Sequence, residues 1–228
     1  MSDASSTAAN LELAQKARAL LPILRRQARR PYIVEFAGTP KAGKTTSLHV
    51  LHRFLRDCGY QVHVMRERAG DCPVAMKGHF FFNTWTTTTM LASMIESLES
   101  EADVLLLDRG VFDAIVWLES QKLDHQLSPE EYEVFRRFVL LDRWHTLTDL
   151  TFVLKVAPDT ALERENKDLL IPRTGSIMAR GSWSATIGCW TRSRIRCEAI
   201  SPFSISTPPR TARPKPPRMR SRWRCSSI

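Results

Sequence analysis

Apolar residues occur along this chain in short runs that alternate with stretches of helical spacing. The apolar run at 32–37 leads into a glycine-rich loop, and apolar residues over 47–55 then recur at intervals of three and four, as on one face of a helix. Three further strands are predicted, one from the alternation of apolar and polar residues at 60–65 and two from apolar runs at 102–107 and 151–156. Other helical patterns lie at 86–100, 111–120, 128–145 and 159–167. This alternation predicts an α/β fold, a three-layer α/β/α domain with a mostly parallel sheet and ligands at the carboxyl ends of its strands.

The chain divides by composition into three parts. Residues 1–30 form an N-terminal extension, in which 1–10 are small and polar and 11–30 combine a leucine stripe with a basic opposite face. We expect disorder in the first ten residues and a helix over the rest that packs on the domain with its basic face in solvent; binding to a partner is the alternative. Residues 31–180 hold the α/β domain, and residues 181–228 form an Arg/Pro/Ser-rich tail.

The segment Gly38–Thr45 reads G-x-x-x-x-G-K-T, the Walker A pattern, between a predicted strand and a predicted helix. Glycines let successive backbone N–H groups point at a phosphate, and the helix N-terminus adds partial positive charge. Lys44 is expected to reach the terminal phosphates, and the Thr45 hydroxyl to ligate magnesium. The predicted phosphate-binding residues are Gly38, Thr39, Pro40, Lys41, Ala42, Gly43, Lys44, Thr45 and Thr46.

Two further polar clusters follow predicted strands. Asp108 ends an apolar strand, as a Walker B aspartate does, and can hold magnesium together with Thr45; Arg109 can then bind a phosphate or the transferred group. Glu67 can accept the proton of an attacking hydroxyl or hydrogen-bond a substrate sugar. The alternatives are a surface glutamate and a capping Asp-Arg pair. Because three chemically interesting clusters fall at strand ends, we favour an active site at that edge of the sheet.

These residues resemble the P-loop nucleoside and nucleotide kinases, in particular the thymidylate kinase and deoxynucleoside kinase branch. The likeness covers roughly residues 31–180 and rests on four motifs: A-G-T-P-K-A-G-K-T-T from Ala37, Arg66-Glu67, L-L-L-D-R-G ending at Gly110, and F-V-L-K-V-A-P-D-T-A-L-E-R-E from Phe152.

The resemblance implies transfer of the γ-phosphate of ATP, with Mg²⁺, to a nucleoside or nucleoside monophosphate. It implies catalytic roles for Lys44, Glu67, Asp108 and Arg109, and an arginine-bearing lid over ATP. Arg164, Lys167 and Arg173 are the lid candidates, and Arg173 is favoured because it lies in a loop at 171–175.

The sequence also departs from that family. Thymidylate kinases usually carry a proline- and glycine-rich turn where this chain has 68–73, and deoxynucleoside kinases would show Glu-Arg-Ser where it has Asp-Arg-Gly. The base specificity therefore cannot be inferred from the resemblance.

Aromatic residues and an amide before the helix at 86–100 can stack on and hydrogen-bond a nucleobase, or they can belong to the core. They are Phe80, Phe81, Phe82, Asn83 and Trp85. A switch GTPase is disfavoured, because such a protein would carry Asp-x-x-Gly after the third strand and Asn-Lys-x-Asp for guanine. This chain has Asp-Arg-Gly-Val from Asp108 and Asn-Lys-Asp-Leu from Asn166, and neither matches. A kinase for another small-molecule hydroxyl, or a non-catalytic nucleotide-binding protein, remains an alternative.

Net charge and cysteine content limit the nucleic-acid, disulfide and metal interactions that we expect of this chain. The 228-residue chain has a formal charge of +9, but the tail holds ten Lys/Arg and one acidic residue, leaving 23 basic and 23 acidic residues in positions 1–180. Nucleic-acid binding is therefore expected only through the tail. Five cysteines with no C-x-x-C pair indicate neither a disulfide framework nor a zinc site. With no long apolar run, we expect no membrane partner and a cytoplasmic protein; a homodimer is allowed.

The tail changes character at about Arg180. Residues 181–228 contain no Leu, Val or Asp and are rich in Arg, Ser, Thr and Pro, which predicts disorder. One explanation is a natural basic tail that binds an acidic partner. The other, which we favour, is translation out of frame, because shifted G+C-rich codons enrich Arg, Pro, Ser, Trp and Cys. The fifth strand and the adenine-binding loop of a kinase would then be missing, and the nucleotide sequence tests this.

Overall fold

The computed structural model describes residues 2–74, 79–124 and 126–168. Their elements are α1 (Ser2–Gln27), β1 (Tyr32–Gly38), α2 (Lys44–Asp57), β2 (Val62–Met65), α3 (Phe80–Glu96), the 3-10 helix η1 (Ser97–Glu99), β3 (Val104–Asp108), α4 (Val111–Leu123), α5 (Pro129–Val139), α6 (Asp142–His145), β4 (Leu150–Leu154) and α7 (Pro158–Asp168). The predicted tail and Arg173 lie outside the described residues.

The four described strands form a parallel sheet in the order β2-β3-β1-β4. In the register of β1 and β3, Phe36 stands opposite Asp108, and Met65 of β2 stands opposite Leu107. The carboxyl ends of β1, β2 and β3 are thus level with one another. The loop after β1 and the polar residues after β2 and β3 therefore meet at one edge of the sheet.

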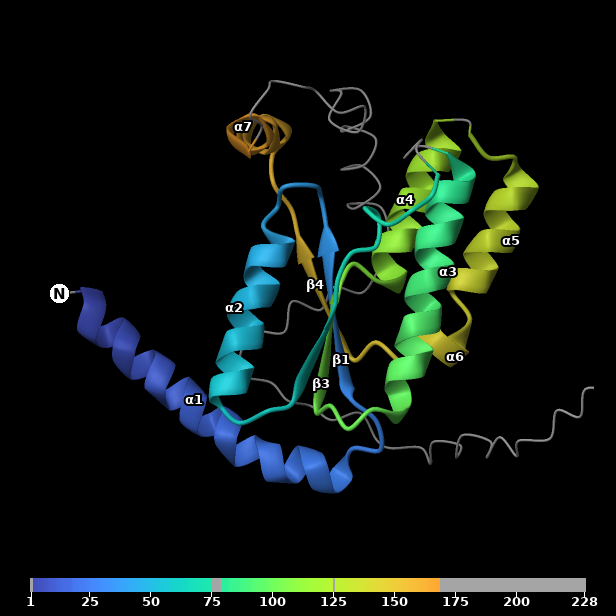
Figure 1. The fold of residues 1–228 in the computed structure, drawn as a ribbon. Coiled ribbons are helices and arrows are strands. Elements are labelled where there is room, and N and C mark those ends of the chain that lie inside the picture. The colour runs from blue at the N-terminus through green and yellow to red at the C-terminus, as the bar shows by residue number, and fades with distance from the viewer. Residues whose placement is uncertain (1, 75–78, 125, 169–228) are drawn as a thin grey trace, which may run out of the picture. The chain divides into compact units, whose positions relative to one another are not determined.

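Helices cover both faces of this sheet, as Figure 1 shows with α2 on one side and α3, α4 and α5 on the other. Val34 and Phe36 pack in a core with Leu48 of α2. Ile33, which points to the opposite face, packs with residues of α3, α4 and α5, among them Met94. The alternation of side chains along β1 explains this division. The predicted three-layer α/β/α fold is confirmed.

Helix α1 begins at Ser2, so the prediction of disorder over residues 1–10 is wrong for the described part of that segment. Two basic residues, one in its last turn and one just after it, anchor it to the sheet, because Arg25 pairs with Asp103 at 2.8 Å and Arg30 pairs with Asp149 at 2.7 Å. Asp149 also accepts the backbone N–H of Ile33. These two ion pairs therefore bind the α1 region to the residues that immediately precede β3 and β4, away from the carboxyl ends of the strands where the candidate site lies.

Two helix boundaries differ from the sequence prediction. Helix α3 starts at Phe80 rather than Thr86, because the His79 side chain accepts the Phe81 N–H and caps the helix there. The helix predicted over 128–145 is two helices, α5 and α6. Its predicted start is confirmed, since Ser128 and Glu131 form a reciprocal capping box. In the described part of the chain, no helix combines the length and the apolar character needed to cross a membrane.

Candidate active site

The loop between β1 and α2 has the backbone that its glycines predict. Gly38 has φ 139° and Gly43 has φ 88°, which L side chains rarely adopt. A Cβ on Gly38 would lie 1.9 Å from the carbonyl oxygen of Leu154, because β4 runs directly beside the loop. Gly38 therefore allows close packing, and Gly43 allows the turn into α2.

Lys44 folds back over this loop and is buried. Its Nζ donates to the carbonyl oxygens of Gly38 at 3.1 Å and Thr39 at 2.9 Å. Burial and the positive charge of Arg109 lower the pKa of Lys44 to about 8, against the opposing effect of nearby carboxylates. An anion bound in the loop would stabilise the charged ammonium and raise this pKa.

Thr45 and Asp108, the two residues proposed from the sequence as magnesium ligands, are in direct contact. The Thr45 hydroxyl donates to Asp108 Oδ2 at 2.6 Å. Among the described residues, Asp108 Oδ1 is buried without a hydrogen-bond partner. A buried, unsatisfied carboxylate oxygen beside a hydroxyl is a donor set that fits a magnesium ion bound to nucleotide phosphates.

Arg109 pairs with one predicted residue of the site, Glu67, and with Asp113, which was not predicted. Its Nε lies 2.7 Å from Glu67 Oε1, and its guanidinium also pairs with Asp113 at 2.8 Å. Burial alone would lower the pKa of Arg109, but the charges of Asp113 and Glu67 raise it on balance. Arg109 also has φ 72°, which is unusual for a residue other than glycine. The side chain is thus held between two carboxylates at the end of β3.

Asp113, in the first turn of α4, is a site residue that the sequence analysis missed. It accepts the backbone N–H of Gly38 at 3.2 Å, the Arg109 guanidinium and the indole N–H of Trp117 at 2.9 Å. It thereby connects the start of the phosphate loop to Arg109. The feature of the sequence that could have identified Asp113 is the presence of a carboxylate within the otherwise apolar stretch 111–118.

Glu35 is a second missed residue, in the middle of β1 and with an exposure of 0%. Its carboxylate accepts the backbone N–H groups of Phe112 at 3.3 Å and Asp113 at 2.9 Å. Burial raises the pKa of Glu35 to about 8, although these donors oppose the rise. The signal was a glutamate within an apolar strand of a parallel sheet, where a charged residue is rarely buried without partners.

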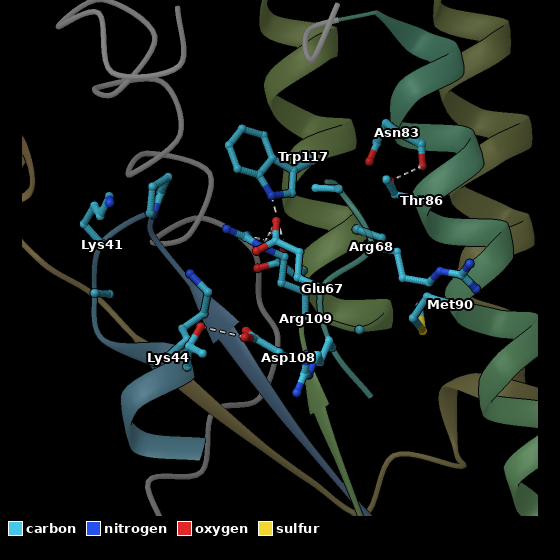
Figure 2. A pocket seen from close by; sticks show the side chains of 18 of the residues that line it. Lys41, Lys44, Glu67, Arg68, Asn83, Thr86, Met90, Asp108, Arg109 and Trp117 are labelled. Atoms are coloured by element: carbon cyan, nitrogen blue, oxygen red, sulfur yellow. Dashed lines mark hydrogen bonds and ion pairs between the residues drawn. The ribbon is translucent and has the colours of Figure 1, made fainter. Parts of the chain in front are cut away.

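One cavity of about 1590 Å³ is lined by Lys44, Thr45, Glu67, Asp108, Arg109 and Asp113. Figure 2 shows Lys41 and Lys44 on one side, Asn83, Thr86 and Met90 on the other, and Glu67, Asp108 and Arg109 between them. The far wall includes a buried amide pair, in which Asn83 donates to Gln121 at 3.2 Å. The cavity thus has a phosphate-loop end and an end walled by α3 and α4.

The predicted aromatic residues are divided between the cavity and the rest of the domain. Phe82 lines the cavity, whereas Phe80 packs on Phe135 with ring centroids 5.6 Å apart, and Phe81 is 63% exposed. The guanidinium carbon of Arg68 lies over the Trp85 ring, 5.6 Å from the ring centroid. Phe82 is therefore the candidate for stacking on a ligand.

Helix α7 contacts the phosphate loop from the end of β4. Arg164 donates to the Lys41 carbonyl oxygen at 2.8 Å, and the Lys41 ammonium pairs with Glu165 at 2.8 Å. Arg164 and Lys167 both line the cavity. These contacts place two of the three predicted lid residues beside the loop; the third, Arg173, lies outside the described residues.

No protein-family model matches this chain, and no curated protein matches it. Solved structures do match it. A deoxyadenosine kinase from M. mycoides with bound dATP superposes with a TM-score of 0.51 at 16% identity, covering 70% of this chain and 82% of that chain. The same enzyme with the products dCMP and a flexible dCDP gives a TM-score of 0.52 at 18% identity, covering 70% and 81%. The chain therefore has the α/β fold of these P-loop nucleoside kinases.

Proposed function

We propose that this protein is a magnesium-dependent kinase that transfers the γ-phosphate of ATP to the hydroxyl of a nucleoside. The observation that carries the proposal is that Lys44, the Thr45–Asp108 pair and the Glu67–Arg109 pair line the same cavity. Phosphoryl transfer needs such a set: a phosphate cradle, metal ligands, a cation and a carboxylate for the acceptor. The shared fold with deoxyadenosine kinases supports the choice of a nucleoside.

On the donor side, the loop N–H groups and Lys44 bind the phosphates of ATP. The Lys44 ammonium exchanges its bonds to Gly38 and Thr39 for phosphate oxygens. Thr45 and Asp108 would hold Mg²⁺, which neutralises phosphate charge when bound. Arg164 and Lys167 on α7 are the candidates to cover the nucleotide, and Arg173 keeps its predicted lid role.

On the acceptor side, Glu67 accepts the proton of the attacking hydroxyl. The proton moves to a Glu67 carboxylate oxygen while the acceptor oxygen bonds to the γ-phosphorus of ATP; the bond from this phosphorus to the β,γ-bridging oxygen breaks, and ADP leaves with the electron pair of that bond. The ion pair with Arg109 holds the Glu67 carboxylate at the cavity wall. Arg109 in turn stabilises negative charge on the transferred group.

The charge balance favours an uncharged acceptor over a nucleoside monophosphate. Arg109, the cation in contact with Glu67, is already matched by two carboxylates. Arg68 is partly exposed, stacks on Trp85 and lies 3.8 Å from Asp71. A second phosphate beside Glu67 would therefore have to compete with Glu67 and Asp113 for the Arg109 guanidinium. The Asn83–Gln121 amide pair offers hydrogen-bonding groups for a base instead.

Turnover of ATP with a panel of nucleosides and nucleoside monophosphates tests the proposal. We expect acceptor-dependent ADP formation with a nucleoside and its loss in Lys44→Ala. Arg53→Ala, which removes an exposed cation from the same helix α2, is the matched control and should keep full activity. Glu67→Gln should lower turnover far more than ATP affinity; an equal loss of both would remove Glu67 from the acceptor site.

Two results would contradict the proposal. Preferential turnover of a monophosphate would reverse the charge argument and favour a thymidylate kinase-like reaction. Tight ATP binding with no turnover on any acceptor would favour a non-catalytic nucleotide-binding protein.

A further inference from the structure

Glu35 is an ionisable residue on an otherwise apolar stretch of sheet surface. Ile33 and Ala37, its neighbours on the same face of β1, pack in apolar clusters with residues of α4. Leu105 and Leu107 present apolar side chains to that face from β3. A charged side chain is costly in such a setting unless its polar atoms are used. The hydrogen bonds of the Glu35 carboxyl group therefore indicate what the residue does in the fold.

The carboxylate of Glu35 caps helix α4 from outside the helix. Gly110 is the N-cap residue of α4 and has no side chain to cap it. Glu35 accepts the N–H groups of Phe112 and Asp113, which are the second and third residues of the helix. A serine at an N-cap position accepts from these same donors. Glu35 thus performs the capping that residue 110 would otherwise perform.

Glu35 and a side chain at position 110 exclude each other. A Cβ on Gly110 would lie 2.6 Å from the Glu35 carboxyl carbon and 2.7 Å from Oε2. The φ of Gly110 is −156°, so its backbone does not need the left-handed region reserved for glycine. A side chain at position 110 therefore requires the Glu35 carboxyl group to move from its place at the start of α4.

The cap is connected to the candidate site through Asp113. Glu35 holds the backbone N–H of Asp113 at 2.9 Å. The Asp113 side chain in turn binds the Gly38 N–H, the Arg109 guanidinium and the Trp117 indole. A shift in the first turn of α4 would therefore move the partner of Arg109 and the partner of the phosphate loop together.

We propose that Glu35 is a positioning residue that caps α4 in place of a side chain at position 110, and that it thereby sets Asp113, Arg109 and the start of the phosphate loop. Its effect on turnover rests on the proposed kinase function. The capping geometry itself does not, and the two are measured separately.

The stability test uses the full chain with Gly110→Ser, Glu35→Ala and the double variant. In the wild-type background, Gly110→Ser should lower the Tm by at least about 5 °C or prevent folding, because the introduced side chain meets the Glu35 carboxylate. In the Glu35→Ala background, the same substitution should leave the Tm unchanged or raise it, because the introduced hydroxyl now has room and caps α4. Equal losses in both backgrounds, or failure to fold in both, would overturn the capping assignment.

A second readout separates positioning from stability. Val34→Ala removes a buried side chain from the same strand but on the α2 face, so it is the matched control. The indole N–H NMR signal of Trp117, assigned with Trp117→Phe, reports on the Asp113 contact. It should shift in Glu35→Ala and stay in place in Val34→Ala. If the signal is unchanged in Glu35→Ala, Glu35 does not position Asp113.

Turnover completes the test. Well below the Tm of each variant, Glu35→Ala should lower acceptor-dependent kcat at least tenfold, whereas Val34→Ala should stay within about twofold of wild type. The double variant should recover part of the loss. Equal kcat in Glu35→Ala and Val34→Ala would overturn the positioning role. If the wild-type chain turned over no acceptor, the proposed function would fail, while the Tm cycle and the indole signal would still decide the geometry.

Discussion

Replacing Lys44 by methionine should make the unliganded protein more stable while removing nucleotide binding. Lys44 is buried, and its pKa of about 8 lies well below the ordinary value of 10.5. The folded protein therefore disfavours the charged ammonium relative to the unfolded chain. Methionine has a similar length and no charge, so it removes this penalty.

The magnitude follows from the pKa difference and the two hydrogen bonds. A shift from 10.5 to about 8 corresponds to about 3 kcal/mol against the charged form at pH 7. The two carbonyl oxygens that accept from Nζ lose their partner in the variant, which costs about 1 kcal/mol each. We therefore expect a net gain of about 1 kcal/mol for Lys44→Met, or about 2–4 °C in Tm.

The stability difference between Lys44→Met and the wild type should change with pH in a defined direction. Between pH 8 and 10.5 the unfolded chain binds a proton that the folded protein has released, so the stability of the wild type rises with pH in this window. The advantage of Lys44→Met should thus be largest at pH 8 and below and shrink towards pH 10.5. Urea unfolding at pH 7, 8, 9 and 10 measures it, with Arg53→Met as the control on the same helix. A variant that is less stable at pH 7, or an advantage independent of pH, would refute this reasoning.

Three further outcomes are expected. ATP binding at pH 8 should take up about half a proton, because phosphate raises the pKa of Lys44, and almost none at pH 6; calorimetry of the wild type in buffers of different ionisation enthalpy detects this, and an uptake that is the same at both pH values would contradict it. Glu35→Gln should gain stability over wild type as pH rises from about 5 to 8, by up to about 4 kcal/mol, because the raised pKa of Glu35 keeps a proton in the folded state that the unfolded state has lost; parallel stability curves for the two proteins would exclude the raised pKa. Asp108→Asn should weaken Mg²⁺ activation about ten- to hundredfold while leaving metal-free ATP binding intact; an unchanged Mg²⁺ requirement would remove Asp108 from the metal site.

The predicted strands and the phosphate loop were accessible from the sequence because they depend on local patterns. Apolar runs identify buried parallel strands, and the two glycines with Lys44 and Thr45 identify the turn into α2. The capping box at Ser128 is likewise a short-range signal and was found in place. The start of α3 was missed because its cap is a histidine, which is not among the usual N-cap residues.

The missed residues, Glu35 and Asp113, have no local motif. Glu35 reads as one polar position in an apolar strand, and its use depends on the N-terminus of α4, more than 70 residues later, lying across its face of the sheet. Asp113 gains its role only because β1 and β3 are neighbours and bring Gly38 within reach. Neither contact can be inferred from spacing along the chain.

The sequence alone determined the fold class, the phosphate loop and the candidate chemistry at the strand ends, because each depends on residues close together in the chain. The tertiary structure decided which of these residues meet. The parallel register set Phe36 beside Asp108 and so brought Thr45 to the Asp108 carboxylate. It also enclosed Glu35, Asp113 and Arg109 in one network, in which burial rather than residue type sets the protonation of Glu35. Strand order and packing decide such contacts, since they bring together groups that the chain itself keeps far apart.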